Sequence, residues 1–273
     1  MKRMTRTMTH CTNGRTRATP WRTAQGLALA VVLAAAVVAA TGPAVADPAT
    51  CRQELGCADP RGCPDIVVDR QGMIEWRVIF QTFPSTDCAV VEGHVAPGTR
   101  RLLVFPTVLA NVGDGDLKIG SPIQHPELYT YEECHGHYHL VEYADYRLWE
   151  PQAFQQWKAL RMATPGTCST RLLETHPELA DRMLSGRKQG FCVIDIDPVC
   201  DGAGDWQYGS CSSNQGISVG WSDIYDTSIE GQWIDITNLP SGDYVFEVEV
   251  NPSRHLQEVD YLNNATAIAV RID

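Results

Sequence analysis

Hydrophobic and polar residues alternate most clearly in the run Tyr244–Val250. From Phe246 onward every second residue is apolar and glutamates lie between, and this period of two predicts a half-buried β-strand. Turn signals bound the run on both sides, with Pro-Ser-Gly-Asp before it and Asn-Pro after it. Shorter apolar runs predict three further strands, at residues 65–68, 100–105 and 108–111.

Helix signals are confined to one stretch, from about residue 151 to residue 184. Its clearest segments are 153–160 and 177–184, and the second begins with Pro177, a favoured first residue of a helix. The chain has no internal repeat and no low-complexity tract. We therefore expect a mainly β protein, a single sandwich-like β domain with a short helical insertion and disulfides.

The first 46 residues differ from the rest of the chain. Residues 1–25 carry six basic side chains and no acidic one, and an uncharged apolar run follows at 26–40. Ala44-Val45-Ala46 then supplies the small residues of a cleavage site, and this order is typical of a secretory signal peptide. A retained membrane anchor is the alternative, but about 15 apolar residues are few for a span. We expect cleavage after Ala46 and a secreted, extracellular protein without a membrane anchor.

The charge balance becomes more acidic once residues 1–46 are set aside. The full chain has 273 residues and a net charge of −11, whereas residues 47–273 carry −17 because the first 46 hold six of the 22 basic residues. This acidity argues against nucleic-acid binding, which needs clustered basic side chains. The hydrophobic content of 44% excludes a disordered protein. An acidic surface would instead attract cationic amines or lysine-rich proteins.

Nine of the ten cysteines follow Ala46, and an oxidising compartment would favour disulfides among them. Because nine is an odd number, we expect at least one cysteine to be free, intermolecular or a metal ligand. Three of the nine crowd into residues 51–63. We interpret residues 47–63 as a cysteine-rich N-terminal arm and residues 64–273 as the main domain.

The segment Cys-His-Gly-His-Tyr-His at 134–139 is the most informative motif. Alternate residues of a strand share a face, so His135, His137 and His139 would present three imidazoles on one side. Same-face neighbours in a straight strand lie roughly 6.5–7 Å apart, so one ion can bind all three only if the chain bends. Gly136 is the easiest place for that bend. Such a nitrogen-rich site suits copper or zinc, which ligand type alone does not separate.

Two later segments carry unusual residues. Lys188 lies between glycines just before a cysteine, and Tyr225 ends the motif Trp-Ser-Asp-Ile-Tyr. Taken singly, Lys188 would be a surface lysine and Tyr225 a core aromatic residue. Taken in order, Cys-His-x-His-Tyr-His, Gly-x-Lys-x-x-Phe-Cys, Gln-Gly-Ile-x-x-Gly, Trp-x-Asp-x-Tyr, Gln-Trp-x-Asp-Ile-Thr and Asp-Tyr-x-Asn-Asn resemble the catalytic domain of the lysyl oxidase family. The resemblance runs from about residue 64 to the end.

The resemblance implies a secreted, copper-dependent amine oxidase. Such an enzyme turns primary amines, such as peptidyl lysine or small alkylamines, into aldehydes, with dioxygen as acceptor and release of ammonia and hydrogen peroxide. The implied copper ligands are His135, His137 and His139. The implied cofactor, lysine tyrosylquinone, would form from Lys188 and Tyr225.

The expected cofactor needs these residue types. Only tyrosine supplies a phenol that can be oxidised to a quinone, and the lysine amine must lose its proton before it can attack the ring. Burial or nearby copper would lower the pKa of Lys188 and so expose the amine. Asp223, two residues before Tyr225, is a weak candidate for the general base.

Two carboxylates and two amides lie close together between residues 257 and 264. Such hard oxygen donors suit calcium, although a polar loop that caps a strand would have the same composition. The resemblance implies that an early Asp-Ile pair completes a calcium site. The expected calcium ligands are Asp65, Ile66, Glu258, Asp260, Asn263 and Asn264.

The family's disulfide pattern is only partly matched. The pairs that the resemblance implies are Cys88–Cys134 and Cys192–Cys211. The family partner of Cys200 is missing, since Trp221 stands in its place, and Cys168 in the helical insertion is the candidate substitute. Two of the three N-terminal cysteines would then pair with each other; these three are Cys51, Cys57 and Cys63.

Two other functions compete with amine oxidation. A non-catalytic secreted β-sandwich that binds copper, for metal storage or surface adhesion, would keep the histidines but have no use for Lys188. A zinc hydrolase with a three-histidine site would leave both Lys188 and Tyr225 unexplained. The choice between a free polyamine and a protein lysine as substrate stays open.

Overall fold

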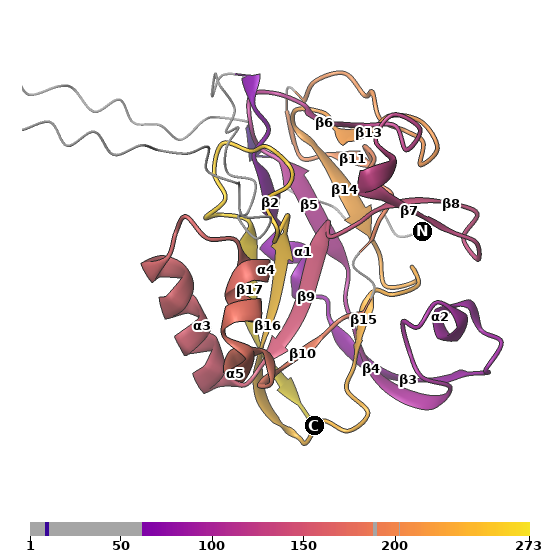
Figure 1. The fold of residues 1–273 in the computed structure, drawn as a ribbon, viewed down its shortest axis with the longest axis vertical. Helices are drawn as coiled ribbons and strands as arrows, with labels where there is room; N and C mark the ends of the chain where they lie inside the picture. The colour runs from indigo at the N-terminus through magenta and orange to yellow at the C-terminus, as the bar shows by residue number, and fades with distance from the viewer. Residues whose placement is uncertain (1–8, 11–61, 188–189, 202) are drawn as a thin grey trace, which may run out of the picture.

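The alternating run near the C-terminus forms β16 (Gly242–Val250), an interior strand of a four-stranded antiparallel sheet. The strand order of this sheet is β10 (Met183–Ser185), β9 (Ala144–Trp149), β16 and β17 (Ala265–Ile272). The computed structural model describes residues 9–10, 62–187, 190–201 and 203–273 (Figure 1). The expected signal peptide and N-terminal arm lie outside these ranges, except for residues 9, 10, 62 and 63.

A second four-stranded antiparallel sheet packs against the first. Its strands, in order, are β11 (Asp197–Pro198), β14 (Trp221–Tyr225), β5 (Thr107–Asn111) and β2 (Ile66–Val68). One hydrophobic cluster contains buried side chains of both sheets, Ile66 and Leu109 from one and Phe246 and Ile268 from the other. The protein is therefore mainly β with a sandwich core, as the apolar runs predict.

Smaller groups of strands and helices extend the two sheets. A three-stranded sheet has the order β15 (Trp233–Asp235), β4 (Gly98–Val104) and β3 (Arg77–Phe83). The two-stranded groups are β6 (Leu117–Gly120) with β13 (Gln215–Ile217), β7 (Tyr129–Glu132) with β8 (His137–Leu140), and β1 (Thr9–His10) with β12 (Cys200–Asp201). The connections contain α1 (Arg70–Met73), α2 (Cys88–Val91) and the 3-10 helix η2 (Pro126–Leu128).

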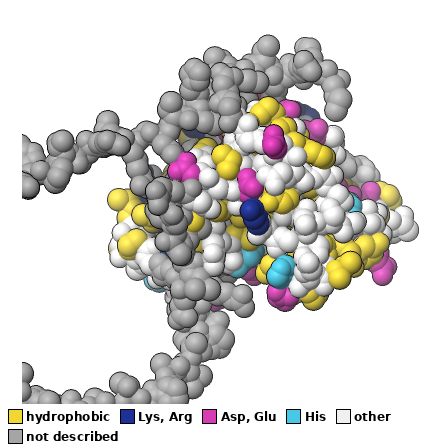
Figure 2. All heavy atoms as spheres, turned by 90° about the horizontal axis from the view of Figure 1, so that it is seen from above, with side chains coloured by type: hydrophobic (Ala, Val, Ile, Leu, Met, Phe, Trp, Pro, Cys, Tyr) yellow, Lys and Arg dark blue, Asp and Glu magenta, His cyan; other side chains and the backbone are white. Residues whose placement is uncertain are grey.

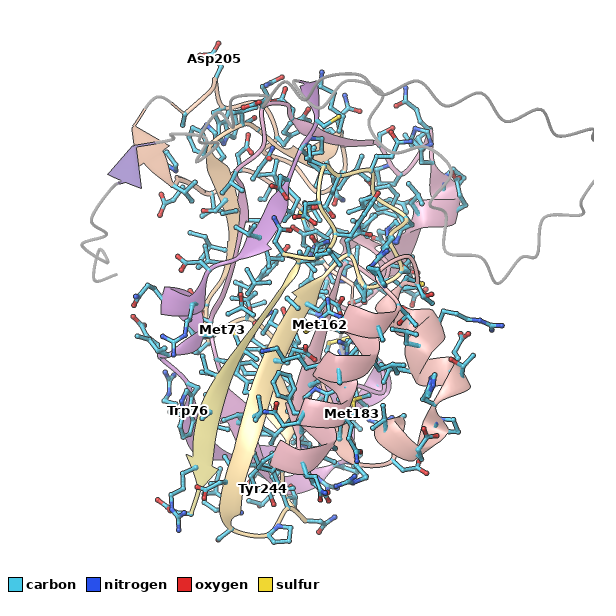
Figure 3. All side chains as sticks on the ribbon, turned by 90° about the vertical axis from the view of Figure 1, so that its left-hand side faces the viewer. Met73, Trp76, Met162, Met183, Asp205 and Tyr244 are labelled. Carbon is cyan, nitrogen blue, oxygen red and sulfur yellow. A yellow bond between two sulfur atoms is a disulfide. The ribbon has the colours of Figure 1, made fainter. Side chains whose placement is uncertain are left out.

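The helical insertion follows β9 directly and lies on the outer side of the β9–β16 pair (Figures 1 and 3). Its helices are α3 (Pro151–Ala163), α4 (Ser169–Thr175) and α5 (Pro177–Ala180). Pro177 begins α5, where the missing N–H of proline costs no hydrogen bond. The predicted helix over 177–184 is wrong beyond Ala180, because residues 183–185 pair with β9 as strand β10.

From Phe246 to Val250, strand β16 is buried on both faces, so the expectation of a half-buried strand is wrong there. Its apolar residues face the sandwich core, while Glu247 and Glu249 are only 2% and 4% exposed. Arg147 of β9 is fully buried, and its Nη1 lies 3.3 Å from Oε2 of Glu247 and 2.5 Å from Oε2 of Glu249. Nη2 of Arg161, on α3, lies 3.0 Å from Oε1 of Glu249. Burial alone would raise the pKa of Glu249, but the two guanidiniums hold it below its ordinary value. The insertion therefore closes over a compensated group of charges.

No helix in the described ranges is long and apolar enough to cross a bilayer. On the face drawn in Figure 2, acidic side chains are scattered among hydrophobic and neutral ones rather than gathered in one patch. The acidity of the chain therefore does not mark a single docking surface on this face.

Replacing Arg147 by alanine should destabilise the protein by about 3–5 kcal/mol, because it leaves the buried carboxylates without the more deeply buried of their two cations. The matched control is Arg271→Ala, which removes an exposed partner of Asp243 and should change the unfolding free energy by less than about 1 kcal/mol. Chemical denaturation followed by tryptophan fluorescence measures both values. Equal losses in the two variants would contradict the role given to Arg147.

Candidate metal centre

The three histidines lie at the tip of the β7–β8 hairpin. Residues 133–136 form the turn and include His135, whereas His137 and His139 belong to β8. Gly136 has a φ of 68°, in the left-handed region that glycine adopts readily, so the chain bends where the sequence predicts. The bend brings the ring centroids to 4.6–5.8 Å from one another. In a straight strand the outer pair would be about 13 Å apart.

Two of the histidines present ligand nitrogens to each other. Nδ1 of His137 lies 2.9 Å from the carbonyl oxygen of His135, and because a carbonyl only accepts, Nδ1 donates and Nε2 keeps its lone pair. Nδ1 of His139 lies 3.0 Å from Oε2 of Glu132, which favours a proton on that nitrogen too. The two Nε2 atoms are 2.8 Å apart, so a shared proton or a cation between them would relieve their repulsion.

The third histidine is turned toward carboxylates. Nε2 of His135 lies 3.2 Å from Oε2 of Glu92 and 3.3 Å from Oε1 of Glu230. Glu132 is also close, at 3.7 Å. None of these glutamates is predicted from the sequence. They come from separate parts of the chain, and only Glu132 is near enough to the histidine motif for the sequence to have signalled it.

Disulfides join the separate parts of the site. Cys88–Cys134 links α2 to the histidine turn, and this link places Glu92 beside His135. Cys192–Cys211 is the second pair, so both pairs implied by the resemblance are present. Cys63 and Cys168 are disulfide-bonded as well, and no cysteine whose side chain is described is free. Cys51, Cys57 and the side chain of Cys200 lie outside the described part, so the pairing of Cys168 with Cys200 stays a prediction.

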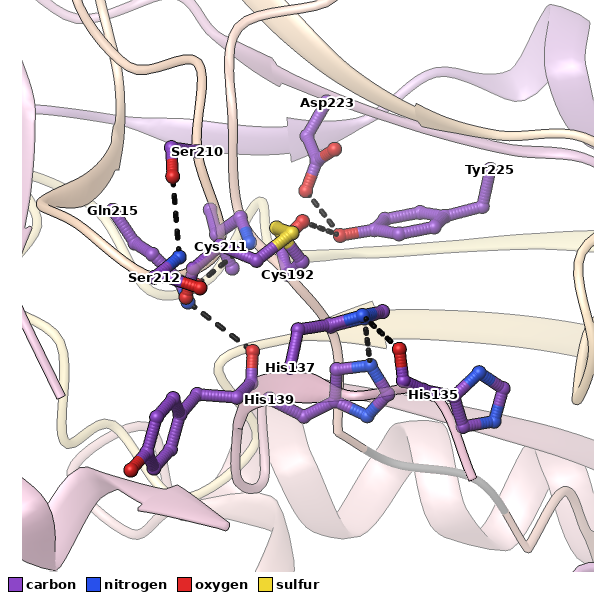
Figure 4. The surroundings of a disulfide bond; sticks show 12 residues. His135, His137, His139, Cys192, Ser210, Cys211, Ser212, Gln215, Asp223 and Tyr225 are labelled. Atoms are coloured by element: carbon purple, nitrogen blue, oxygen red, sulfur yellow. Dashed lines mark hydrogen bonds between the residues drawn. A yellow bond between two sulfur atoms is a disulfide. The ribbon is translucent and has the colours of Figure 1, made fainter. Parts of the chain in front are cut away.

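Tyr225 is buried on β14, with Asp223 two residues earlier on the same side of the strand. Its hydroxyl donates to Asp223 and lies 2.9 Å from the carbonyl oxygen of Cys192 (Figure 4). Burial raises the pKa of Asp223 and of Tyr225 well above their ordinary values, and the Asp223 carboxyl adds to the shift of Tyr225. The phenol is therefore protonated, oriented and shielded from water.

The segment that follows Lys188 contacts both the histidines and the tyrosine. Phe191 exchanges two backbone hydrogen bonds with Leu140 of β8, with N···O distances of 2.7 and 3.1 Å. Its ring centroid lies 4.6 Å from that of Tyr225. A Cβ at Gly190 would lie only 3.2 Å from the Cβ of His139, so glycine permits this close approach. Lys188 itself lies outside the described residues.

The expected calcium ligands gather where β2 meets the loop before β17. Glu258 is buried and accepts hydrogen bonds from the Ile66 N–H at 2.7 Å and from the Asn264 amide at 2.9 Å. Asp65 accepts from the Asn263 amide at 2.9 Å. The amide oxygens of Asn263 and Asn264 are buried without a hydrogen-bond partner. These orphaned hard oxygens fit a calcium ion.

The carboxylates of the expected calcium site lie farther apart than the ligands of a complete metal site. Ligand atoms of Asp65, Glu258 and Asp260 do not form a group within 4.8 Å of one another among the described residues. Asp260 instead caps its own turn by accepting from the Leu262 N–H at 2.8 Å. The structure thus brings Asp65, Glu258 and the asparagines together and leaves Asp260 at the edge.

Comparison with known proteins agrees with the resemblance that the sequence motifs show. The family model described as lysyl oxidase matches residues 84–159 and 171–273. Lysyl oxidase homolog 2 of Gallus gallus is 31% identical over 222 residues, which cover 77% of this chain and 24% of that protein. Lysyl oxidase homolog 2A of Danio rerio is 30% identical over 231 residues, 80% of this chain and 27% of that protein. The chain therefore spans about a quarter of the length of the curated relatives it matches.

Calcium removal should destabilise the protein more at pH 8 than at pH 5. Without a cation, burial raises the pKa of Glu258 to about 8. The folded protein therefore keeps its full stability below about pH 4.5, where Glu258 is neutral in both the folded and the unfolded state, and loses stability as the pH rises toward 8. A bound calcium ion would favour the ionised carboxylate. Thermal unfolding in EGTA and in added calcium, measured across this pH range, tests the expectation.

The control for the calcium experiment is Glu258→Gln, which cannot ionise. Its Tm should lose both the calcium response and the part of the pH dependence between about 4.5 and 8 that Glu258 contributes. A calcium response of the same size in the variant and in the parent would contradict the site.

Proposed function

The chain belongs to the lysyl oxidase family, and from this premise we propose that it is a copper-dependent amine oxidase. Primary amines, either peptidyl lysine in a lysine-rich protein or small alkylamines, would be oxidised to aldehydes, with dioxygen reduced to hydrogen peroxide and ammonia released. The observation that carries the proposal is the contact of one segment, residues 190–192, with both the histidine strand and Tyr225. We also propose that residues 1–46 are removed and that the enzyme acts outside the cell.

The histidine cluster has the donor chemistry of a copper site. Three imidazoles lie within 5.8 Å of one another by ring centroid, and His139 is almost fully buried. We propose that His135, His137 and His139 hold the ion. When bound, copper would supply the activation of dioxygen that oxidation of a phenol requires. Glu132 would keep the ring of His139 oriented through its contact with Nδ1.

Asp223 and Tyr225 prepare the phenol for oxidation. The hydroxyl of Tyr225 points at the carboxylate, so Asp223 can take its proton when the ring is oxidised. Because both groups are buried, the proton moves between them rather than to water. Phe191 packs on the ring and limits its rotation. This contact would also hold the ring in place for attack by an amine.

We propose Lys188 as the amine that completes lysine tyrosylquinone. Lys188 and Gly190 are two residues apart, so their α-carbons are separated by at most about 7 Å. Gly190 packs on His139 and the next residue packs on Tyr225, which supports a lysine amine near both. We propose calcium, held by Asp65, Glu258 and their asparagine neighbours, as a structural cofactor.

Copper-loaded protein should show a visible quinone absorbance, a Lys188–Tyr225 cross-linked peptide by mass spectrometry, and peroxide release from amines. Lys188→Arg and Tyr225→Phe should bind copper but lose all three signals, since each removes one half of the cofactor. The controls are Lys158→Arg and Tyr131→Phe, at exposed positions. Assaying alkylamines beside lysine-rich proteins identifies the substrate class. Copper-loaded parent protein without quinone or peroxide would favour a copper-binding β-sandwich instead.

Asp223→Asn should slow quinone formation by about 10²–10⁴-fold, the usual contribution of a positioned base, with little change in copper binding. The rate at which visible absorbance appears after copper addition measures the effect. Asp226→Asn, which alters a partly exposed neighbour that accepts from Ser228, serves as control. Unaltered kinetics in Asp223→Asn would remove Asp223 from the mechanism.

A further inference from the structure

A second group of metal-ligand atoms lies beside the histidine cluster. Oε2 of Glu92 and Oε1 of Glu230 lie 3.8 and 3.9 Å from Nδ1 of His94. The same two oxygens lie 3.2 and 3.3 Å from Nε2 of His135. Ligand atoms of Glu92, His94 and Glu230 are all within 4.8 Å of one another. Two imidazoles therefore flank one pair of carboxylate oxygens.

This group is poorly compensated without a cation. The side chains of Glu92, His94, His135 and Glu230 are only 11–25% exposed. Both carboxylate oxygens of Glu92 and one of Glu230 are buried without a hydrogen-bond partner, as is Nε2 of His135. In the ion pairs of the described residues, these two glutamates meet only histidines. Carboxylates withdrawn from water in this way need a positive charge close by.

The spacing of these ligand atoms brackets that of a bound set, with the His135 distances at its lower end and the His94 distances slightly above it. In a tetrahedral site with bonds of about 2.0–2.2 Å, ligand atoms lie about 3.3–3.6 Å apart. The four nitrogen–oxygen distances here are 3.2, 3.3, 3.8 and 3.9 Å. Imidazole nitrogens combined with carboxylate oxygens are a usual donor set for zinc, whereas the neighbouring cluster offers nitrogen alone.

The group also has a route to solvent. A pocket of about 470 Å³ includes His94 in its wall, together with Trp233 and Asp235. An ion could enter along this pocket and meet His94 first. An entry path of this kind is one of the requirements of a metal site.

We propose that Glu92, His94 and Glu230 bind a second divalent cation, zinc by its donor set, with His135 at the edge shared with the copper ligands. When copper holds His135, three ligands and one open position are left at the second site. The proposal goes beyond amine oxidation and rests on the proposed function only in assigning His135 to copper.

The test is zinc binding to the copper-loaded full chain. Calorimetry measures the zinc affinity, and metal analysis after dialysis measures the amount of zinc bound. We expect about one zinc per chain in addition to copper, and at least a tenfold loss of zinc affinity in His94→Gln and in Glu230→Gln, each of which removes a ligand. His125→Gln is the matched control, because His125 pairs with a single glutamate, Glu127, at 3.6 Å. Circular dichroism and Tm establish that each variant is folded.

Two independent variants keep the test decisive if one of them fails to fold. Parent protein that takes up no zinc beyond copper, or zinc affinity that is unchanged in a folded His94→Gln or Glu230→Gln variant, would overturn the proposal. Tyr225→Phe separates it from the amine oxidase proposal, because this variant cannot form the quinone and should still bind zinc. Copper-loaded parent protein that binds zinc but forms no quinone would count against the proposed function alone.

Discussion

A carboxylate that is taken out of water must meet a cation, a set of hydrogen-bond donors or a proton, and this requirement governs the interior of the protein. The described core contains Glu247, Glu249, Asp223 and Glu258, all nearly inaccessible to solvent. Each lies between secondary-structure elements that are distant in sequence. How each charge is compensated therefore also determines how those elements are held together.

The protein compensates these carboxylates in three ways. Arg147 and Arg161 neutralise the glutamates of β16, and the helices of the insertion then cover the whole group. Backbone and amide donors surround Glu258, which joins β2 to the loop before β17. Asp223 accepts a hydrogen bond from the hydroxyl of Tyr225, and burial raises the pKa of both groups. The arginine–glutamate group stabilises the fold, the surroundings of Glu258 suit a cation, and the Asp223–Tyr225 pair suits proton transfer.

The same requirement is least satisfied near the histidine turn. There Glu92, Glu132 and Glu230 converge on His135 from α2, from β7 and from the loop before β15. The Cys88–Cys134 disulfide and the bend at Gly136 bring these segments together. A region that combines imidazoles with incompletely compensated carboxylates is one in which bound metal would stabilise the fold as well as supply reactivity.

Tyr225 became a candidate only through the family resemblance. Local patterns in the chain were enough to predict the β-rich class, the strands β2, β4 and β5, the bend at Gly136 and the candidate residues at 135, 137 and 139. These features depend on side-chain alternation, on apolar runs and on motif spacing, which neighbouring residues specify. The burial of Glu247 and Glu249 was beyond such patterns, because alternation shows which residues share a face but not whether a helix later covers it. Likewise Glu92 and His94 are two residues apart, but Glu230 is far from both along the chain. Glu230 precedes β15 and His94 precedes β4, so the pairing of these two strands brings the three residues together, and the Cys88–Cys134 disulfide adds His135. Only the tertiary structure therefore concentrates charge and burial at this point.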